Sequence, residues 1–544
     1  MPNILNNKNS MKHLLARIVA LSLLFAAYCT QSASAQTKQG DDAVQQLRKL
    51  NQVYRYLNAA YIDEVEMSPL VEKAVVAMLQ ELDPHSTYIS PEEMKSVSIQ
   101  LDGEFSGIGI EFRVLRDTIV VTNTITGAPA ADVGILPNDR IVAIDGKNVI
   151  GIKTAEVPNL LRGKTGTKVE VDVARRGFGE SLKFAITRDK IPMHTIDAVY
   201  KVNDNIGYVR INRFGHTTSR EFADALNRLN GVGSYIIDLR GNGGGIMSAA
   251  VEIAENFLPL GATIVSTEGR MVPHRSVKSR INGSLQRENV VVLIDESSAS
   301  ASEILAGALQ DWDRAVIIGR NSFGKGLVQR QFELDDKSAV RITVAKYLTP
   351  SGRAIQRPYE KGHRDEYYKS YRDRILHPDS VRRDSVPHKI NHTLVLNREI
   401  PEGKGIVPDI EIPADTTKVS PYVIGIVGKG LLHEYLYDYL GSNADKLSKQ
   451  YSSFGRFERD FVVDDRMLSE LSGIAKRAGI DMTGADAAYT DGFLRTQLKA
   501  LIARRLFTSG EYYRIINDCN DKVFARAVEV LSDWENSGKR IIGR

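Results

Sequence analysis

The sequence predicts a multidomain α/β protein. A helical N-terminal segment is followed by a β-rich domain, an α/β layered core and a helical C-terminal domain. With 544 residues the chain is too long for a single hydrophobic core. Its middle part changes from short strands with glycine turns to strands that alternate with helices, and this alternation is typical of a sheet covered by helices. Toward the C-terminus the apolar residues return to helical spacing.

The first 35 residues have the order of a cleavable export signal. Basic residues precede the apolar run Ile18–Ala27, and Ala33-Ser34-Ala35 follows in the place of a cleavage site. The run is short for a membrane span, which needs roughly 20 apolar residues. We therefore expect cleavage after Ala35 and an exported protein, periplasmic or in the cell envelope. The mature chain then keeps only Cys519, expected to be a buried thiol, so its stability depends on packed cores rather than disulfides.

The charge of the chain is balanced. Its 71 basic and 67 acidic side chains give a formal net charge of +4, and the basic residues are scattered rather than gathered along one element. A nucleic-acid-binding protein would carry a basic stripe or patch. We therefore expect no nucleic-acid partner, and the residues indicate neither a metal site nor a cofactor.

Residues 36–98 are predicted to form a helical segment. Apolar residues recur at three- and four-residue spacing over 47–57 and again over 71–79. Leu82-Asp83-Pro84-His85-Ser86 is interpreted as a turn. Ser90-Pro91-Glu92-Glu93 is typical of a helix start, with serine as the N-cap and proline in the first turn.

Residues 99–190 resemble a PDZ domain. The resemblance is carried by Gly107-Ile108-Gly109-Ile110, by Ala128-Pro129-Ala130-Ala131, and by Gly134–Ile141 leading to Ile144-Asp145-Gly146. A PDZ domain binds the free carboxylate of a peptide on the backbone amides of its glycine loop, and the peptide adds a strand beside it. The alternative is a plain glycine turn in a small β domain. The residues implied in carboxylate binding are Gly107, Ile108, Gly109 and Ile110.

Residues 191–415 are predicted to form the α/β layered core, and residues 416–544 a helical domain. Between 206 and 348 apolar strands alternate with helices. The polar stretch 358–400 is interpreted as a surface insertion. The helical periodicity of the last domain suits a dimer or partner surface, and a self-contained packed domain explains it equally well.

Three segments of the core carry candidate chemistry. Asp238–Gly245 follows an apolar strand, and its successive glycines allow backbone amides to converge on an oxyanion or a phosphate. Ser297–Glu303 lies between a buried strand and a helix, where small residues let a carbonyl group approach a hydroxyl. Ser322–Gly326 follows the strand Ala315–Ile318.

A nucleotide site is the first alternative, and the residues disfavour it. Gly319–Lys325 fits the first seven positions of a P-loop, but Gly326 replaces the Ser or Thr that would bind Mg²⁺. The residues after Gly326 resemble a strand rather than the required helix. Gly241–Gly245 fails as a dinucleotide site because Ile246 stands where the last glycine is needed.

Two other hydrolytic arrangements also fit less well. Ser322 and Lys325 have Ser-x-x-Lys spacing, but that motif needs both residues on one helical turn. A Ser-His-Asp triad could draw on ten histidines, yet none lies in a comparable glycine-rich turn between strand and helix. His85, beside Asp83 and Pro84, is interpreted as a turn residue.

Taken together, the segments closely resemble the carboxyl-terminal processing (tail-specific) family of serine peptidases. The similarity runs in family order over most of residues 45–415. The resemblance implies a crotonase/ClpP-like layered core and a peptidase that acts at protein C-termini. Further motifs that carry it are Tyr61-Ile62-Asp63-Glu64-Val65, Leu82–Ser86, Ser298–Asp311, Phe323-Gly324-Lys325-Gly326, Thr349-Pro350-Ser351-Gly352-Arg353 and Gly405-Ile406-Val407-Pro408-Asp409.

The resemblance also implies roles for individual residues. The nucleophile of the family is a serine, its base is a lysine oriented by a further residue, and its oxyanion hole is made of backbone amides. The matching positions are Ser300 as nucleophile, Lys325 as general base, Gln329 as its orienting residue, Gly243, Gly244 and Ala301 as oxyanion donors, and Glu303, Asp311 and Ser322 as supporting residues.

The chemistry of a Ser-Lys pair is coherent. A serine hydroxyl is a weak nucleophile until a base takes its proton, and lysine is a base only when neutral. The reference pKa of lysine is about 10.4, and burial can lower it by roughly 3–5 units. A lysine on a loop packed under apolar strands is therefore a plausible base, whereas a solvated surface lysine is not.

The parts suggest one hypothesis and one alternative. The hypothesis is that the PDZ-like domain captures the apolar C-terminus of a protein or peptide and delivers it to Ser300; a homo-oligomer or an adaptor protein is a further candidate partner for the C-terminal helical domain. The alternative is a PDZ-containing adaptor or chaperone whose peptidase core is inactive. The joint presence of Ser300, Lys325 and Gln329 argues against the alternative, because peptide binding alone needs none of them.

Overall fold

The computed structural model describes residues 42–125, 127–376, 389–414, 420–482, 487–519 and 521–543. The chain divides into two compact units, Met1–Met78 and Leu79–Arg544. The predicted export signal and its cleavage site lie outside the described residues. Within the described ranges, no helix has both the length and the apolar character needed to cross a bilayer.

The described part of the first unit is helical, as the sequence predicts. A helix covers residues 42–60, and α2 (Met67–Gln80) begins in this unit. In the second unit, α3 (Pro91–Asp102) starts at the predicted N-cap. The Ser90 amide donates to Glu93 at 2.9 Å, and the Glu93 amide donates to the Ser90 hydroxyl at 3.3 Å. This reciprocal pair satisfies two donors that the helix start would otherwise leave free.

The β-rich domain is an antiparallel sheet whose edge is β3. The strand order is β3-β4-β5-β7-β8, and the short β6 pairs with β5. Alternate residues such as Ile119, Val121 and Ile141 are completely buried and form its core. The elements are β3 (Ile110–Leu115), β4 (Thr118–Thr124), α4 (Pro129–Asp132), β5 (Arg140–Ile144), β6 (Lys147–Asn148), α5 (Val157–Leu161), β7 (Lys168–Ala174) and β8 (Leu182–Thr187). A separate ribbon of β2 (Glu104–Gly107) and β9 (Asp189–Pro192) pairs the two ends of the domain.

The core is built on a six-stranded sheet of order β10-β11-β12-β15-β16-β21. All neighbours are parallel except β10 and β11, and the parallel part explains why its strands are almost continuously apolar. The predicted alternation of strands and helices is confirmed. The elements are β10 (Ile196–Lys201), β11 (Ile206–Ile211), α6 (Thr218–Arg228), β12 (Ser234–Asp238), α7 (Met247–Glu255), β15 (Asn289–Ile294), α8 (Ala301–Asp311), β16 (Val316–Gly319) and β21 (Ile410–Glu411).

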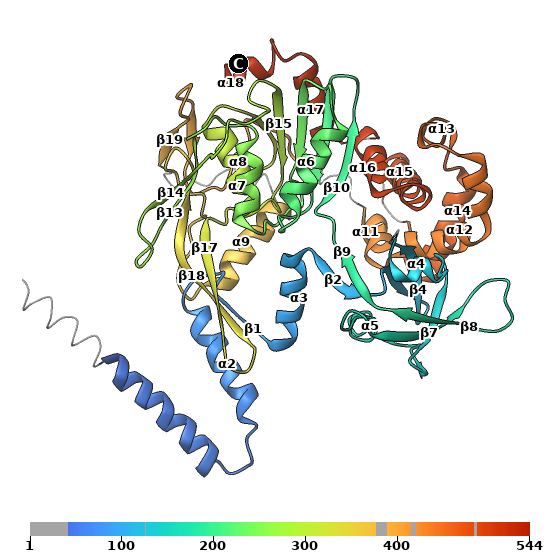
Figure 1. The fold of residues 1–544 in the computed structure, drawn as a ribbon, viewed down its shortest axis with the longest axis horizontal. Helices are drawn as coiled ribbons and strands as arrows, with labels where there is room; N and C mark the ends of the chain where they lie inside the picture. The colour runs from blue at the N-terminus through green and yellow to red at the C-terminus, as the bar shows by residue number, and fades with distance from the viewer. Residues whose placement is uncertain are drawn as a thin grey trace, which may run out of the picture. The chain divides into compact units, whose positions relative to one another are not determined.

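Helices cover both faces of this sheet (Figure 1). Ile237 and Val292 belong to the cluster that includes residues of α6, α7 and α8. Their neighbours Ile236 and Val291 point to the opposite face, where they join Phe524 of α17 (Lys522–Ser532). Because side chains alternate along a strand, the sheet is buried on both sides.

The core also contains a second sheet, which is antiparallel. Its order is β1-β18-β13-β14, with β17 paired to β18. The strand predicted after Gly326 is therefore present as β17, where a P-loop would require a helix. The elements are β1 (Thr87–Ile89), β13 (Thr263–Glu268), β14 (Arg275–Lys278), β17 (Leu327–Glu333) and β18 (Ala339–Leu348).

The C-terminal helices divide between two cores. The helices from α11 to α16 have their own apolar cluster, and α17 and α18 pack on the sheet of the core instead. Cys519, expected to be buried, is exposed at the end of α16. The elements are α11 (Pro421–Gly428), α12 (Leu431–Gln450), α13 (Phe454–Asp460), α14 (Asp465–Arg477), α15 (Ala487–Leu506), α16 (Ser509–Asp518) and α18 (Gly538–Ile542).

The polar stretch 358–400, interpreted as a surface insertion, contains a helix with one buried tyrosine. It forms α9 (Arg364–Leu376) and the hairpin β19 (Ile390–His392) with β20 (Glu399–Pro401). Tyr367 is 5% exposed, and its ring contacts Phe323. Aromatic residues at helical spacing give α9 a face that packs on the core despite its polar composition.

Candidate active site

Ser300 lies in the turn between β15 and α8. Its backbone has φ 57° and ψ −110°, a conformation that costs a non-glycine residue roughly 1–3 kcal/mol. Gly244 packs directly against it. A Cβ on Gly244 would lie 2.6 Å from the Ala299 carbonyl oxygen and 2.8 Å from the Ser300 Cβ. Only glycine therefore allows the two predicted loops to meet.

The three backbone amides predicted as oxyanion donors belong to the loops that meet here, and their bonding differs. The Gly244 amide donates to Asn242 Oδ1 at 2.8 Å. The amides of Gly243 and Ala301 make no hydrogen bond within the described ranges. Of the three, the Gly244 amide is used within its own loop, and the lack of a side chain at Gly244 is what lets the two loops approach.

Asn242 joins the glycine loop to the serine loop. Its side chain is buried, and Nδ2 donates to the Ile211 carbonyl at 2.9 Å. Its own carbonyl accepts from the Ser302 hydroxyl at 2.9 Å and from the Ala299 amide at 3.0 Å. The main-chain carbonyl of Asn242 thus fixes the glycine loop against the serine loop, while its side chain holds the glycine loop on β11.

Glu303 connects the serine loop to the lysine loop. Its carboxylate accepts from the amides of Ser300, at 2.8 Å, and Lys325, at 2.9 Å. It also accepts from the Gly324 amide at 2.7 Å and from the Ser322 hydroxyl. The group is completely buried, which raises the pKa of Glu303, and the four hydrogen bonds oppose that shift.

Lys325 has the environment that a neutral lysine needs. Burial and, after it, the charge of Arg341 lower the pKa of Lys325, while Glu303 and Asp83 oppose the shift. No hydrogen bond between Lys325 Nζ and Ser300 Oγ occurs in the part of the chain that the structure describes. The structure brings the two loops together without that bond.

Gln329 contacts His85, which the sequence analysis did not place at the candidate site. Its side-chain amide donates to the His85 carbonyl at 2.6 Å, and no hydrogen bond to Lys325 is present among the described residues. His85 is buried, and burial together with the charge of Lys325 lowers the pKa of His85 to about 4. His85 is a turn residue, as expected, but the turn lies at the candidate site.

The turn at Leu82–Ser86 is built around Asp83. One carboxylate oxygen accepts from the amides of His85 and Ser86, at 2.9 Å and 3.0 Å. The same oxygen accepts from the Thr343 hydroxyl of β18 at 3.0 Å. The segment is therefore anchored beside the strands that follow Lys325. An aspartate two residues before a histidine, with a proline between them, was the available signal for this turn.

Helix α9 and the segment before it hold the lysine loop. Arg357 lies over the Tyr367 ring at 4.3 Å and over the Phe323 ring at 5.1 Å. Arg374 donates to the carbonyls of Ser322 and Phe323 at 2.9 Å and 3.3 Å. Sequence analysis assigned no role to these residues, although the run of tyrosines in α9 was a signal for a packed helix.

The remaining supporting positions are buried. Asp311 pairs with Arg353 at 3.0 Å, with both side chains inaccessible, and accepts from the Ser351 amide at 2.9 Å. The Ser322 hydroxyl accepts from the Ile406 amide at 2.7 Å. These contacts place the two family motifs near residues 350 and 406 around the serine and lysine loops.

The predicted carboxylate loop of the β-rich domain borders a narrow groove. A cavity of about 60 Å³ is lined by the loop, by Phe105 and Phe112, and by Pro158, Leu161 and Arg162. Gly109 has φ 79°, and a Cβ there would lie 2.2 Å from Ala128 Cβ. Among the described residues β3 pairs with β4 alone, so its other edge is open beside this groove.

Comparisons with known proteins agree with this architecture. Residues 205–362 match the model of peptidase family S41, 120–175 match a PDZ domain, and 22–93 match the activating protease CtpB N-terminal domain. Residues 422–508 match a family of unknown function, DUF8443. The fold and the loops thus define a PDZ-containing serine peptidase of the S41 type.

The relatives narrow the class to one family. A carboxy-terminal-processing protease of Bartonella bacilliformis is 35% identical over 345 residues, which cover 62% of this chain and 79% of that protein. Carboxy-terminal processing protease CtpA of Bacillus subtilis is 38% identical over 312 residues, 57% of this chain and 66% of that protein, just under two thirds of its length. The solved photosystem II D1 C-terminal processing protease is 28% identical, with a TM-score of 0.32, over 56% of this chain and 89% of that one. The chain belongs to the carboxy-terminal processing protease family.

Proposed function

We propose that this chain is an exported serine endopeptidase that processes or degrades proteins from their C-terminal ends, with Ser300 as nucleophile and Lys325 as general base. The observation that carries the proposal is the Glu303 carboxylate. It binds the backbone amides of both residues, at 2.8 Å and 2.9 Å, and so holds the two loops as one site. Export to the periplasm or cell envelope rests on the N-terminal sequence pattern.

The proposed reaction proceeds through an acyl-enzyme. Neutral Lys325 accepts the proton of the Ser300 hydroxyl as Oγ attacks the carbonyl carbon of the scissile bond. The oxyanion that forms is stabilised by the unpaired amides of Gly243 and Ala301. The C–N bond then breaks, and Lys325 returns the proton to the leaving amine. A water molecule, deprotonated by Lys325, then attacks the ester; the C–Oγ bond breaks, Lys325 returns the proton to Ser300 Oγ, and the new C-terminus is released.

Gln329 is proposed to orient Lys325 during the reaction. In the structure its Nε2 donates to the His85 carbonyl, and the side-chain oxygen Oε1 is the atom that would accept a hydrogen bond from Lys325 Nζ. The low pKa of His85 keeps its imidazole neutral, so that it adds no positive charge beside the lysine. Asp311 and Ser322 are proposed to be structural.

The β-rich domain is proposed to capture the substrate. The open edge of β3 can accept a peptide as an added strand, and the loop amides at Ile108 and Gly109 can bind its free carboxylate. Protein and peptide C-termini are thus the proposed partners. A homo-oligomer or an adaptor protein remains a proposal for the helices beyond residue 416.

Turnover of an unfolded protein tests the nucleophile. Ser300→Ala should abolish cleavage, while Ser297→Ala, which changes an exposed serine in the same loop, should leave it intact. Unchanged turnover of Ser300→Ala would refute the assignment and favour the adaptor or chaperone alternative.

A peptide with a free carboxylate should be cut faster than its C-terminal amide. Equal cleavage of both would remove the capture role and leave the peptidase standing.

A further inference from the structure

A second cavity lies between the β-rich domain and the C-terminal helices. It has a volume of about 490 Å³ and is lined by β3 and β4 on one side and by residues of α11, α12 and α15 on the other. Its walls are tied together outside the cavity, where Arg116 pairs with Glu434 at 3.0 Å and with Asp438 at 2.8 Å. The helices here lie in the region of unknown function, 422–508.

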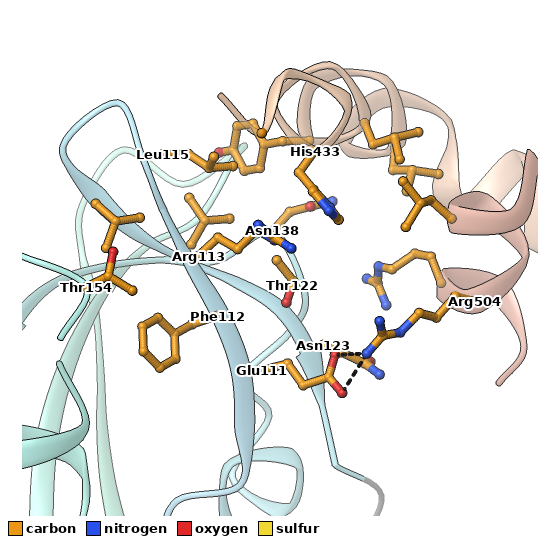
Figure 2. A pocket seen from close by; sticks show the side chains of 18 of the residues that line it. Glu111, Phe112, Arg113, Leu115, Thr122, Asn123, Asn138, Thr154, His433 and Arg504 are labelled. Atoms are coloured by element: carbon orange, nitrogen blue, oxygen red, sulfur yellow. Dashed lines mark hydrogen bonds and ion pairs between the residues drawn. The ribbon is translucent and has the colours of Figure 1, made fainter. Parts of the chain in front are cut away.

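The cavity carries an excess of positive charge. Figure 2 shows Arg113, His433 and Arg504 extending toward one another from a strand and two helices. Arg505 also lines the cavity, and its Nε is buried without a hydrogen-bond partner. The single carboxylate in the wall is Glu111, which Arg504 already binds at 2.9 Å.

The electrostatics of the wall indicate a place for an anion. The charge of Arg504 adds to burial in lowering the pKa of Arg113. Burial and the charges of Arg113 and Arg504 lower the pKa of His433 to about 4. Lys429, the remaining cation in the wall, donates to the Ala478 carbonyl at 2.7 Å. Cations that repel one another in this way are stabilised by a negative charge placed between them.

The side chains of β3 alternate between the two faces of the strand, and they line both this cavity and the peptide groove. Ile110, Phe112 and Val114 pack on the core of the β-rich domain, and Phe112 lines both the groove and the cavity. Glu111 and Arg113 point to the other face of the strand, under the helices. A peptide added to the open edge of β3 alternates in the same way. Its last and third-last side chains therefore enter the groove, and its second- and fourth-last side chains face the cavity.

We propose that the cavity of Arg113, Arg504, Arg505 and His433 is a specificity site that favours substrate tails with Glu or Asp at the second and fourth positions from the C-terminus. The inference rests on the proposed capture of a C-terminus by β3. It assigns the C-terminal helices a direct part in substrate selection, because they supply three of the four cationic or imidazole groups.

Binding of labelled tails to the full chain carrying Ser300→Ala tests this site without cleavage. Two peptides with the same apolar ending carry either Glu or Gln at the second and fourth positions from a free carboxylate. We expect the Glu tail to bind roughly three- to tenfold more tightly, as fits partly exposed charge pairs. Arg113→Gln with Arg504→Gln should remove the preference, and Arg176→Gln should keep it. Arg176 binds Ser442 at 2.7 Å but does not line the cavity, so it is a matched control.

A charge reversal and a spectroscopic signal distinguish a lost specificity site from a variant that is merely misfolded. Arg113→Glu should shift the preference from the Glu tail toward a matched Lys tail, which a merely unstable variant cannot do. Binding of the Glu tail, and not the Gln tail, should also raise the pKa of His433 followed by NMR. Equal binding of Glu and Gln tails to the parent overturns the proposal. C-terminal amides test the capture step separately, because their failure to bind supports capture whatever the Glu-to-Gln ratio.

Discussion

Replacing Glu303 with Gln isolates the contact that holds the serine and lysine loops together. The carboxylate accepts four hydrogen bonds, two on each oxygen, from Ser300, Lys325, Gly324 and Ser322. A glutamine has one accepting oxygen, so in its better orientation it keeps the two bonds to Ser300 and Lys325. Its NH₂ group then faces the Gly324 amide, a donor that is left unsatisfied.

The expected cost follows from these contacts. A hydrogen bond to a charged group contributes roughly 1.5–3 kcal/mol, and leaving a buried donor unsatisfied costs about 1–3 kcal/mol. We therefore expect Glu303→Gln to lower the free energy of unfolding by about 2–4 kcal/mol. A displaced loop also misplaces the reacting groups. We therefore expect kcat to fall roughly 100-fold.

Chemical unfolding and steady-state kinetics on the same preparations measure both effects. Glu434→Gln is the matched control, because Glu434 pairs with Arg116 whose side chain is 48% exposed. Such a pair contributes at most about 1 kcal/mol. If Glu303→Gln unfolds like Glu434→Gln and keeps its kcat, Glu303 does not join the loops, and the central argument for the site fails.

Three further predictions concern geometry and charge. Gly244→Ala should cut kcat strongly because the new Cβ meets the serine loop at 2.6–2.9 Å, whereas Gly241→Ala, with φ 75° but only one side-chain atom at 3.6 Å, should affect stability more than rate. Activity should rise with pH as Lys325 loses its proton, and Arg341→Gln should move that rise to higher pH because Arg341 lowers the pKa of Lys325. Gly109→Ala should weaken binding of free-carboxylate tails, since its Cβ would meet a neighbouring side chain at 2.2 Å.

Each of these has a clear contrary result. Equal kcat for the two alanine variants would mean that Gly244 is not in contact with the serine loop during catalysis. If the pH profile of Arg341→Gln is the same as that of the parent, then Lys325 is not the group whose loss of a proton limits the rate. Unchanged tail affinity in Gly109→Ala, with an unchanged melting temperature, would place the carboxylate site away from this loop.

The sequence by itself determined the order of the parts and the identity of the loops. Strand and helix periodicity predicted the layered core, and the glycine and serine runs after β12 and β15 predicted where two candidate loops begin. These features are local, because a turn or a helix cap depends on a few neighbouring residues. The resemblance to a peptidase family then named Ser300 and Lys325 as candidates, and the structure brings the loops that carry them together.

Only the tertiary structure decided how these loops are joined and what surrounds them. Glu303 as the tie between the loops, the Gly244 amide held by Asn242, and Gln329 bound to the His85 carbonyl all depend on contacts between distant segments. The same holds for α9, whose polar composition concealed a packed face, and for the basic cavity shared by β3 and the C-terminal helices. Periodicity shows which face of an element is apolar, but the partner of that face is set by the packing of the whole chain.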